Sequence, residues 1–358
     1  MIPNREPVMT RLLIYEPSFR RIEAEIRKFE PGLDVILMDG AGALTSNGKP
    51  LEAADAAPDA AWLSEALYMS PQTRTFVGIL LAAPALKWVQ SAAAGFDNPL
   101  FARLVRSGAR LTTSHGQAVG MADYVLWGVL DAFQRGPERR AAQDGGRWEE
   151  FEVREVAGTT WLIIGFGSIG KAVAARARAF GARIIGVRRN LSADPAADQI
   201  VGLDAIGEQL AGADVVVICT PLNAATYHMA DETFFEGLKD GAVLVNVGRG
   251  RLIDESALLP ALERGRPVHA ILDVFETEPL PAESPLWRHP RVTVTAHCSG
   301  VTGGQTGRNE DLFVDNLSRF LEEKVLLNEA DPADVLAGVD LTAAPVRRET
   351  WAASPEGG

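Results

Sequence analysis

Three polar residues that could carry acid–base chemistry follow short apolar stretches in the second half of the chain. Arg249 lies in the segment N-V-G-R-G, Glu278 precedes a proline, and His297 follows the segment V-T-A. A guanidinium group suits two parallel hydrogen bonds to a carboxylate or a 2-keto acid, and a histidine paired with a carboxylate can transfer a proton. Each residue alone also has an ordinary structural explanation. Together at one edge of a sheet, they form an anion anchor and an acid–base pair.

The apolar stretches ahead of these residues predict strands of one parallel sheet. In open α/β sheets, ligands bind beyond the carboxyl ends of the strands, so the three residues are expected to share the binding edge. Asp273 ends one of these strands and is a further candidate at that edge. The predicted strands are Val215–Cys219, Leu244–Val247, Ala270–Asp273 and Val292–Thr295.

A glycine motif precedes these strands. Gly165, Gly167 and Gly170 form G-x-G-x-x-G between a predicted strand, Thr160–Ile164, and a predicted helix, Lys171–Phe180. In this context the first glycine makes a tight turn, the second lets the backbone approach a pyrophosphate, and the third lets helix and sheet pack closely. The free N–H groups and the dipole at the helix N-terminus favour the pyrophosphate. The motif therefore predicts a dinucleotide-binding unit.

Two other interpretations of these glycines exist. The segment also matches G-x-x-x-x-G-K of a nucleoside-triphosphate P-loop, but Ala172 follows, and alanine has no hydroxyl to bind magnesium. A glycine loop with only a structural role is the second alternative, and the strand and helix that flank the motif argue against it.

The end of the next strand, Arg183–Val187, indicates which dinucleotide is preferred. An Asp or Glu about 20 residues after the glycines would bind the ribose hydroxyls of NAD. Here Arg188 and Arg189 occupy that place, and no acid occurs before Asp194. Two guanidinium groups favour a 2′-phosphate, so we predict NADP as the preferred cofactor, with NAD possible. Arginines that only face solvent are the alternative.

The first hundred residues alternate short apolar strands with helical stretches, which predicts a second parallel sheet covered on both faces. Helices are predicted at Phe19–Phe29 and Leu100–Ser107, and a loop at Gly40–Pro58. The predicted strands are Leu12–Tyr15, Val35–Met38, Ala60–Trp62, Leu86–Gln90 and Arg110–Thr112.

A run of small residues follows the fourth of these strands. Ala93, Ala94 and Gly95 lie just beyond its carboxyl end, and small side chains leave backbone N–H groups open to an anion. An unremarkable turn between strand and helix is the alternative, because such loops are common in these sheets.

The length of 358 residues favours two domains. A small-residue crossover before the predicted helix Met121–Gln134 marks the boundary. The predicted helix Asn309–Glu323 returns the chain to the first domain. The predicted organisation is therefore residues 1–117 for substrate, 118–301 for the dinucleotide, 302–335 back in the first domain, and a tail at 336–358, disordered at its end.

Composition excludes several classes of protein. A net charge of −12 argues against a nucleic-acid partner. Cys219 and Cys298 are the two cysteines of the sequence, so a disulfide framework is not expected, and a reducing compartment, the cytoplasm, is predicted. The longest apolar run is too short to span a bilayer, and no membrane partner is expected. A metal at the adjacent His297 and Cys298 is not expected, because two adjacent ligands without a third make a poor site.

These motifs together resemble the D-isomer-specific 2-hydroxyacid dehydrogenases, over about residues 11–328. The resemblance implies that Arg249 binds the carboxylate and carbonyl of a small 2-keto acid, that Glu278 and His297 are the catalytic acid–base pair, and that Asp273 lies near the nicotinamide. It also implies that backbone amides of Ala93, Ala94 and Gly95 hold the substrate carboxylate. The chain departs from the family at Asp123, where the family often has Glu, and at Cys298, where an aliphatic residue is common.

The resemblance implies an α/β protein with two Rossmann-like or flavodoxin-like parallel-sheet domains and the active site in the cleft between them. The implied activity is reduction of a small 2-keto acid to the D-2-hydroxy acid, as in glyoxylate and hydroxypyruvate reductases. A homodimer is also implied, with its contact through 118–151. The alternative is a corepressor or sensor of the same fold with little turnover. The expected cofactor contacts are Gly165, Gly167, Ser168, Ile169, Gly170, Arg188, Arg189, Thr220, Pro221, Thr226, Val247, Gly248, Asp273, Ser299 and Gly300.

Overall fold

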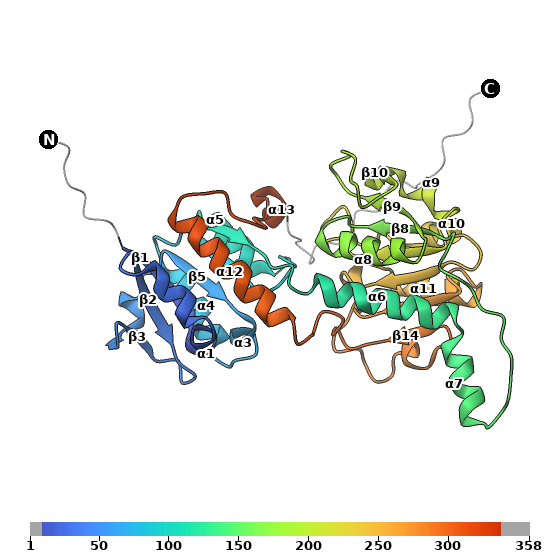
Figure 1. The fold of residues 1–358 in the computed structure, drawn as a ribbon, viewed down its shortest axis with the longest axis horizontal. Helices are drawn as coiled ribbons and strands as arrows, with labels where there is room; N and C mark the ends of the chain where they lie inside the picture. The colour runs from blue at the N-terminus through green and yellow to red at the C-terminus, as the bar shows by residue number, and fades with distance from the viewer. Residues whose placement is uncertain (1–8, 97, 338–358) are drawn as a thin grey trace. The chain divides into compact units, whose positions relative to one another are not determined.

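A computed structural model describes residues 9–96 and 98–337 and divides into two compact units, each built around one seven-stranded sheet (Figure 1). Within these residues, unit 1 combines the chain up to Gly116 with the segment from Thr302 onward, and unit 2 comprises Gln117–Val301. The chain therefore leaves unit 1 once, builds unit 2 without interruption, and returns.

The sheet of unit 2 is parallel throughout. Its order brings β8, which precedes the glycine motif, next to β11 at the centre of the sheet. In order across the sheet the strands are β10 (Gln199–Val201), β9 (Arg183–Val187), β8 (Thr160–Ile164), β11 (Val215–Ile218), β12 (Val243–Asn246), β13 (His269–Leu272) and β14 (Val292–Val294).

Helices cover both faces of this sheet, because alternate residues of its central strands enter two separate cores. In β8, Leu162 and Ile164 enter one core, whereas Trp161 and Ile163 enter the other. The first core receives side chains of α9 (Ile206–Leu210), α10 (Glu232–Gly237) and α11 (Glu255–Glu263), and the second those of α6 (Ala118–Phe133) and α8 (Ser168–Ala179). Burial on two faces explains why these strands are continuous apolar runs.

Unit 1 has a set of parallel strands, and two antiparallel strands extend its sheet on one side. The strand order is β4 (Lys49–Leu51), β3 (Leu44–Ser46), β2 (Leu33–Met38), β1 (Thr10–Tyr15), β5 (Ala60–Leu63), β6 (Trp88–Ser91) and β7 (Arg110–Thr112). Its helices are α1 (Glu16–Arg21), α2 (Glu23–Ile26), α3 (Glu65–Tyr68), α4 (Thr73–Ala82), α5 (Pro99–Arg106), α12 (Gln305–Leu321) and α13 (Pro332–Leu336).

The prediction of a loop at Gly40–Pro58 was wrong, because β3 and β4 form a hairpin there, antiparallel to β2. Asn47 and Gly48 connect the two strands with φ angles of +52° and +73°. Asn-Gly with two positive φ angles is the two-residue turn that matches the twist of a hairpin. Three-residue strands were too short for an alternating pattern to be recognised.

The single helix predicted at Phe19–Phe29 was also wrong. It is divided into α1, α2 and a 3₁₀ turn at Arg27–Phe29, with a break at Ile22, where φ is −125° and ψ is 20°. The break keeps Phe19, Ile22 and Ile26 in the same core, against α12 residues of that core. Core packing has overridden helical continuity in this segment.

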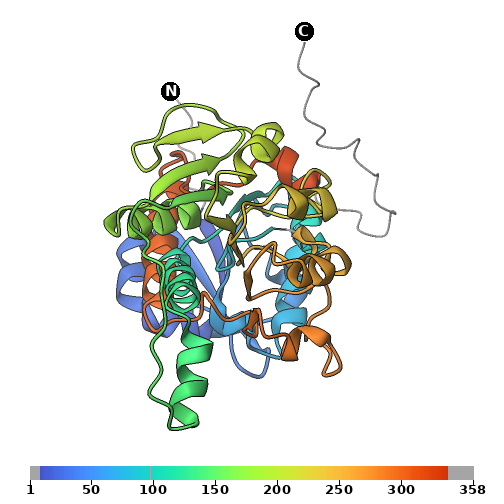
Figure 2. The same ribbon diagram turned by 90° about the vertical axis from the view of Figure 1, so that its right-hand side faces the viewer.

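The helix α7 (Gly136–Asp144) follows α6 and extends away from the sheet of unit 2, as both Figure 1 and Figure 2 show. The sequence pattern did not predict it, because its exposed face is rich in charged residues. Arg140 forms a bidentate pair with Asp131 of α6, at 2.7 and 2.9 Å, which ties α7 to the helix before it.

Within residues 9–96 and 98–337, no helix combines the length and the apolar character needed to cross a membrane. The predicted tail at 336–358 lies outside the described residues from position 338 onward. Before that point α13 forms, capped by the Asp331 carboxylate, and it buries Val335 against unit 1.

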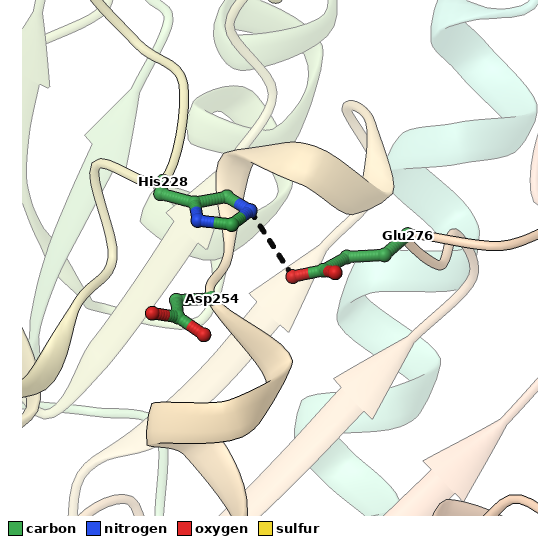
Figure 3. A group of neighbouring side chains, drawn as sticks. All are labelled: His228, Asp254 and Glu276. Atoms are coloured by element: carbon green, nitrogen blue, oxygen red, sulfur yellow. Dashed lines mark ion pairs between the residues drawn. The ribbon is translucent and has the colours of Figure 1, made fainter. Parts of the chain in front are cut away.

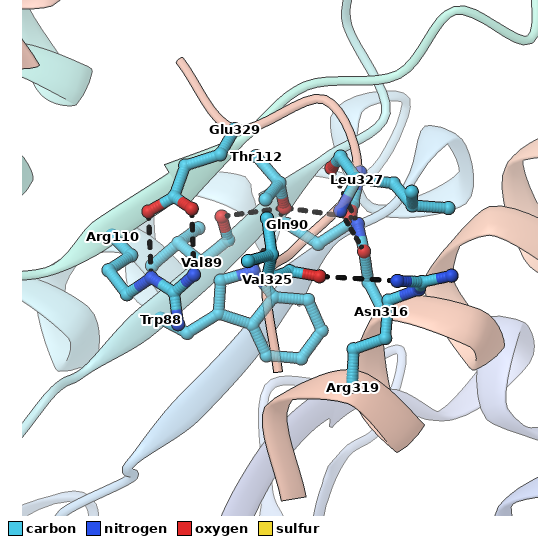
Figure 4. A network of polar contacts seen from close by, with 10 residues as sticks. All are labelled: Trp88, Val89, Gln90, Arg110, Thr112, Asn316, Arg319, Val325, Leu327 and Glu329. Atoms are coloured by element: carbon cyan, nitrogen blue, oxygen red, sulfur yellow. Dashed lines mark hydrogen bonds and ion pairs between the residues drawn. The ribbon is translucent and has the colours of Figure 1, made fainter. Parts of the chain in front are cut away.

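A buried polar network fixes the returning chain in unit 1 (Figure 4). Asn316 of α12 is fully buried and accepts the Leu327 amide at 2.7 Å. Its Nδ2 donates to the Leu327 carbonyl oxygen at 3.0 Å and to Gln90 Oε1 at 2.9 Å. Gln90 Oε1 also accepts the Thr112 hydroxyl at 2.7 Å. Asn316 thus joins α12 to the segment after it and to β6, and Gln90 extends the network to β7.

We expect Asn316→Ala to lower the free energy of unfolding of unit 1 by about 2–4 kcal/mol, because it removes three hydrogen bonds of a fully buried side chain and leaves the buried Gln90 Oε1 with one donor fewer. Arg319→Ala, one turn away on α12, removes only exposed contacts, an ion pair with Asp315 and a hydrogen bond to the Val325 carbonyl oxygen, and should cost less than about 1 kcal/mol. Urea unfolding measures both. Equal losses in the two variants would contradict the importance of the buried network.

Candidate active site

The glycine motif forms the turn between β8 and α8, and its three glycines meet different constraints. Gly165 has a φ of +103°, and a Cβ on it would lie 2.6 Å from the Thr220 backbone nitrogen. A Cβ on Gly170 would lie 2.4 Å from the Gly165 carbonyl oxygen, so glycine lets α8 begin close to the strand. A Cβ on Gly167 would meet no atom within 4 Å. The backbone at Gly167 is therefore open at the N-terminus of α8, where a phosphate is favoured.

The loop after β11 lies beside this turn. Cys219 Sγ donates to the Gly165 carbonyl oxygen at 3.1 Å, and burial raises the pKa of the thiol to about 12, so the thiol stays protonated. The Thr226 hydroxyl is buried, donates to the Pro221 carbonyl oxygen at 2.8 Å, and accepts the Asn223 amide at 2.9 Å. Thr226 therefore braces the turn, and any effect on a cofactor would act through the shape of that turn.

A cationic corner, formed by Lys171, Arg188, Arg189 and Asp194, lies at the end of β9. Arg188 Nη1 donates to Asp194 Oδ2 at 2.9 Å, and Lys171 Nζ lies 2.8 Å from the same oxygen. The hydrogen bond from Lys171 and the Ala196 amide hold the pKa of the Asp194 carboxyl below its usual value. These four side chains carry three positive charges and one negative charge, so the corner favours an anion.

Arg249 is presented by a rigid turn after β12. Asn246 is fully buried, accepts the Gly248 amide at 3.0 Å, and donates to the Arg249 carbonyl oxygen at 2.9 Å. A Cβ on Gly250 would lie 1.8 Å from the Phe275 carbonyl carbon. Only glycine allows this contact between two backbones, which fixes the Arg249 turn against the loop after β13.

Glu278 and His297, for which the sequence predicts acid–base chemistry, lie in direct contact. Glu278 Oε2 lies 2.8 Å from His297 Nδ1, while Oε1 of the same carboxylate accepts the Phe275 amide at 3.0 Å. The side chains are half exposed, at 51% for His297 and 35% for Glu278. Since Nδ1 faces a carboxylate, it carries a proton, and Nε2 is the nitrogen through which the ring can exchange a proton with a ligand.

A second cluster of side chains includes Glu276 of the loop after β13, together with His228 and Asp254 (Figure 3). His228 Nε2 is 3.1 Å from Glu276 Oε1. Each of the three side chains has an atom that could bind a metal ion, and these atoms lie within 4.8 Å of one another. Both carboxylates already cap α11, because Asp254 accepts the Ser256 amide at 3.0 Å and Glu276 accepts the Glu255 amide at 3.0 Å. The cluster therefore braces the segment that leads to Glu278.

The structure places the predicted residues of unit 2 at the carboxyl ends of six consecutive strands of one sheet, from β9 to β14. Asp273 is buried behind His297 and binds the loop that carries it. The residues at this edge are Gly165, Gly167, Ser168, Ile169 and Gly170 after β8, Arg188 and Arg189 after β9, Thr220 and Pro221 after β11, Val247, Gly248 and Arg249 after β12, Asp273 and Glu278 after β13, and His297, Ser299 and Gly300 after β14.

The predicted anion-binding loop belongs to unit 1 and follows β6. The Ala93 amide donates to the buried Ser91 hydroxyl at 3.0 Å, and the Ala93 carbonyl oxygen accepts the Ser114 amide. The Tyr68 hydroxyl lies 2.9 Å from Ser91 Oγ, and burial raises the pKa of Tyr68 to about 12. The Ala93 amide is thus already engaged, and the anion-binding hypothesis now depends on Ala94 and Gly95.

Sequence reasoning missed two residues near the acid–base pair. Tyr124 of α6 and Thr295 after β14 join through their hydroxyls at 2.8 Å, and Thr295 Oγ1 donates to Asp273 Oδ1 at 2.6 Å. They are separated by 171 positions, and neither lies in a motif, so the sequence carried no signal for this contact.

The fold and the site define a dinucleotide-binding α/β protein with an arginine and a carboxylate–imidazole pair at its binding edge. Residues 126–299 match the family model described as "D-isomer specific 2-hydroxyacid dehydrogenase, NAD binding domain". The chain belongs to the D-isomer-specific 2-hydroxyacid dehydrogenases, a family of oxidoreductases. The resemblance and the fold class of two parallel-sheet α/β domains are confirmed, and unit 2 is a nicotinamide-dinucleotide-binding domain.

Several similar proteins match more than half of the chain. It is 34% identical to a glyoxylate/hydroxypyruvate reductase A of Serratia proteamaculans over 54% of this chain and 62% of that one. It is 32% identical to a glyoxylate reductase of Korarchaeum cryptofilum over 67% of this chain and 74% of that one. A crystal structure of a D-isomer specific 2-hydroxyacid dehydrogenase from Xanthobacter autotrophicus Py2, in complex with NADPH and MES, is 29% identical and covers 91% of this chain and 99% of that one, with a TM-score of 0.75.

Proposed function

We propose that this protein is an NADPH-dependent reductase of small 2-keto acids such as glyoxylate or hydroxypyruvate, and that it forms the D-2-hydroxy acid. The contact that carries the proposal is the 2.8 Å pair between Glu278 and His297, at the same sheet edge as Arg249 and the open glycine turn. The relatives named glyoxylate reductases and the NADPH complex of the Xanthobacter structure support the choice of substrate and cofactor.

The reduction needs a proton donor at the carbonyl oxygen, and His297 is the residue proposed for that role. A nicotinamide held at the glycine turn would supply a hydride to the keto carbon, and negative charge would then develop on the carbonyl oxygen. The Glu278 carboxylate accepts a hydrogen bond from Nδ1–H of His297 and fixes the orientation of the ring. Nε2 then donates its proton to the developing alkoxide, and the Glu278 carboxylate stabilises the cationic ring before transfer.

Arg249 supplies the positive charge that this reaction needs. Its guanidinium group suits the carboxylate of a 2-keto acid, and it stabilises the negative charge that develops on the neighbouring carbonyl oxygen. The Asn246 hydrogen bonds and the Gly250 backbone contact hold its turn in place, so little reorganisation is required when substrate binds.

The loop after β6 is proposed to contribute backbone N–H groups to the binding of the substrate carboxylate. Its amides at Ala94 and Gly95 are the candidates, because Ser91 already accepts the Ala93 amide. The Ser91 hydroxyl holds this loop through the Ala93 amide, and the Tyr68 hydroxyl lies 2.9 Å from Ser91 Oγ.

NADP preference is proposed from the cationic corner. Arg188 directs its Nε and Nη2 to carbonyl oxygens of Asn190 and Ser192 within its own loop, both at 2.7 Å, so it orders the loop as well as supplying charge. Arg189 is exposed beside it and is the side chain proposed to meet the 2′-phosphate. Asp194 offsets part of the positive charge and keeps Lys171 and Arg188 together.

A homodimer and a cytoplasmic location complete the proposal. The location is supported by Cys219 and Cys298, which are both free thiols. The dimer is supported by exposed tryptophans on the segment 118–151, since Trp127 is 48% exposed and Trp148 is 99% exposed.

We expect light scattering to give twice the chain mass of 38.4 kDa and Trp148→Glu to shift the mass towards the monomer. A monomeric wild type would contradict the dimer.

We expect His297→Gln to lower kcat for glyoxylate or hydroxypyruvate reduction by about 10²–10⁴-fold, because it removes the proton donor. The dissociation constant for NADPH, measured by the fluorescence of the bound cofactor, should change less than about threefold, since the glycine turn is untouched. A wild-type protein that binds NADPH and reduces neither acid would instead support a sensor or corepressor of this fold.

We expect Arg189→Ala to lower kcat/KM for NADPH by about 10–100-fold, because one charge-assisted contact to a phosphate is lost. The value for NADH should stay within about threefold, because NADH has no 2′-phosphate. Arg183→Ala, an exposed arginine at the start of β9, is the matched control and should leave both values unchanged. A wild-type preference for NADH would disprove the cofactor proposal.

A further inference from the structure

The loop that carries His297 is held by a single buried residue. Asp273 is 1% exposed, and its backbone carbonyl oxygen accepts the His297 amide at 2.8 Å. Its carboxylate accepts the Cys298 amide and the Ser299 amide, both at 2.9 Å. Three successive amides of the loop therefore end on one residue, and the position of the imidazole follows the position of Asp273.

His297 needs this support because its backbone is in the left-handed region, with a φ of +49°. Non-glycine residues adopt this conformation only where the surrounding structure enforces it. Hydrogen bonds on the amide of His297 and on the two amides that follow it provide that enforcement. A shift of the Asp273 carboxylate would therefore move His297 relative to Glu278.

Two hydroxyl groups outside the predicted site hold the Asp273 carboxylate in turn. Thr295 Oγ1 donates to Asp273 Oδ1 at 2.6 Å, and Tyr124 Oη lies 2.8 Å from Thr295 Oγ1. The carboxylate can only accept, so the Thr295 proton points to Asp273 and Tyr124 must donate to Thr295. The chain of donors thus runs in one direction, from Tyr124 on α6 through Thr295 to Asp273.

Tyr124 always donates the first hydrogen bond of this series, because its phenol stays protonated. Burial, followed by the negative charge of Asp273, raises the pKa of the phenol above its usual value, so Tyr124 keeps its proton over the pH range in which such enzymes are assayed. Its ring is also held by Trp127, at 5.5 Å between ring centroids, on the same helix.

We propose that Tyr124 and Thr295 are positioning residues for His297. They act through Asp273 to keep the imidazole in hydrogen-bonding contact with Glu278. The proposal rests on the proposed function for its catalytic meaning, but its structural content is independent of turnover. It gives α6 a part in the acid–base chemistry, besides its packing against the sheet.

The test compares Thr295→Val, which removes the hydroxyl and keeps the shape, with Thr295→Ser, which keeps the hydroxyl. Tyr124→Phe removes the other hydroxyl. Thr293→Val is the matched control, because it removes a threonine hydroxyl that contacts His269 at 2.9 Å, two residues earlier in the same segment. Thermal melting confirms that each variant is folded.

We expect Thr295→Val and Tyr124→Phe to lower kcat by about 5- to 50-fold, with KM for NADPH within twofold, because a small displacement of a catalytic group is costly. The solvent isotope effect on kcat should rise in both, since proton transfer becomes slower. Thr295→Ser and Thr293→Val should resemble the wild type. The double variant Tyr124→Phe, Thr295→Val should be no slower than Thr295→Val alone, because one chain of donors is broken in each.

A second measurement does not require turnover. The sequence has five histidines, so the ring ¹⁵N signals of His297 can be assigned by their loss in His297→Gln. At alkaline pH we expect the proton on Nδ1 in the wild type, Thr295→Ser and Thr293→Val, and a mixture of tautomers in Thr295→Val and Tyr124→Phe.

The two measurements separate the possible failures. A wild type that reduces no 2-keto acid would remove the proposed function, and the ¹⁵N signals would still decide the positioning role. If the Val and Ser variants at position 295 match each other in tautomer and in rate, the positioning proposal is overturned.

Discussion

The parallel direction of the strands in unit 2 is the constraint on which the site depends. Because six consecutive strands from β9 to β14 end at one edge, residues as far apart in the sequence as Gly165 and His297 are brought to that edge without long loops. The glycine turn, the cationic corner and Arg249 each lie at the end of one strand, and Glu278 and His297 follow two neighbouring strands. Their mutual placement is then set by sheet geometry, and only short connections have to be fixed locally.

Local fixation uses backbone groups more than side-chain pairs. Phe275 donates its amide to Glu278, Asn246 spans the Arg249 turn, and Asp273 collects the amides that follow β14. The side chains of Glu278, Asn246 and Asp273 each form hydrogen bonds with backbone groups, and each therefore orders one turn. Arg249 and His297, carried by the turns that these contacts order, are the side chains proposed to meet the substrate.

The sequence was sufficient where a pattern has a local physical cause. Continuous apolar runs located most strands of both sheets, and the glycine spacing located the turn before α8, because burial on two faces and close backbone approach each demand particular residues. It failed at the hairpin β3–β4, whose strands are three residues long, and at Ile22, where core packing interrupts a helix. It also could not find Tyr124, because contact with Thr295 depends on how α6 packs on the sheet.

The contact between Gly250 and the Phe275 peptide has a consequence for how such a protein can diverge. Where two main chains touch directly, no side chain remains through which mutation can adjust their spacing in small steps. The distance between the Arg249 loop and the Glu278 loop therefore stays the same in any variant that keeps this fold. Diversification towards new acids has to proceed through the residues that surround the anchor and leave its geometry unchanged.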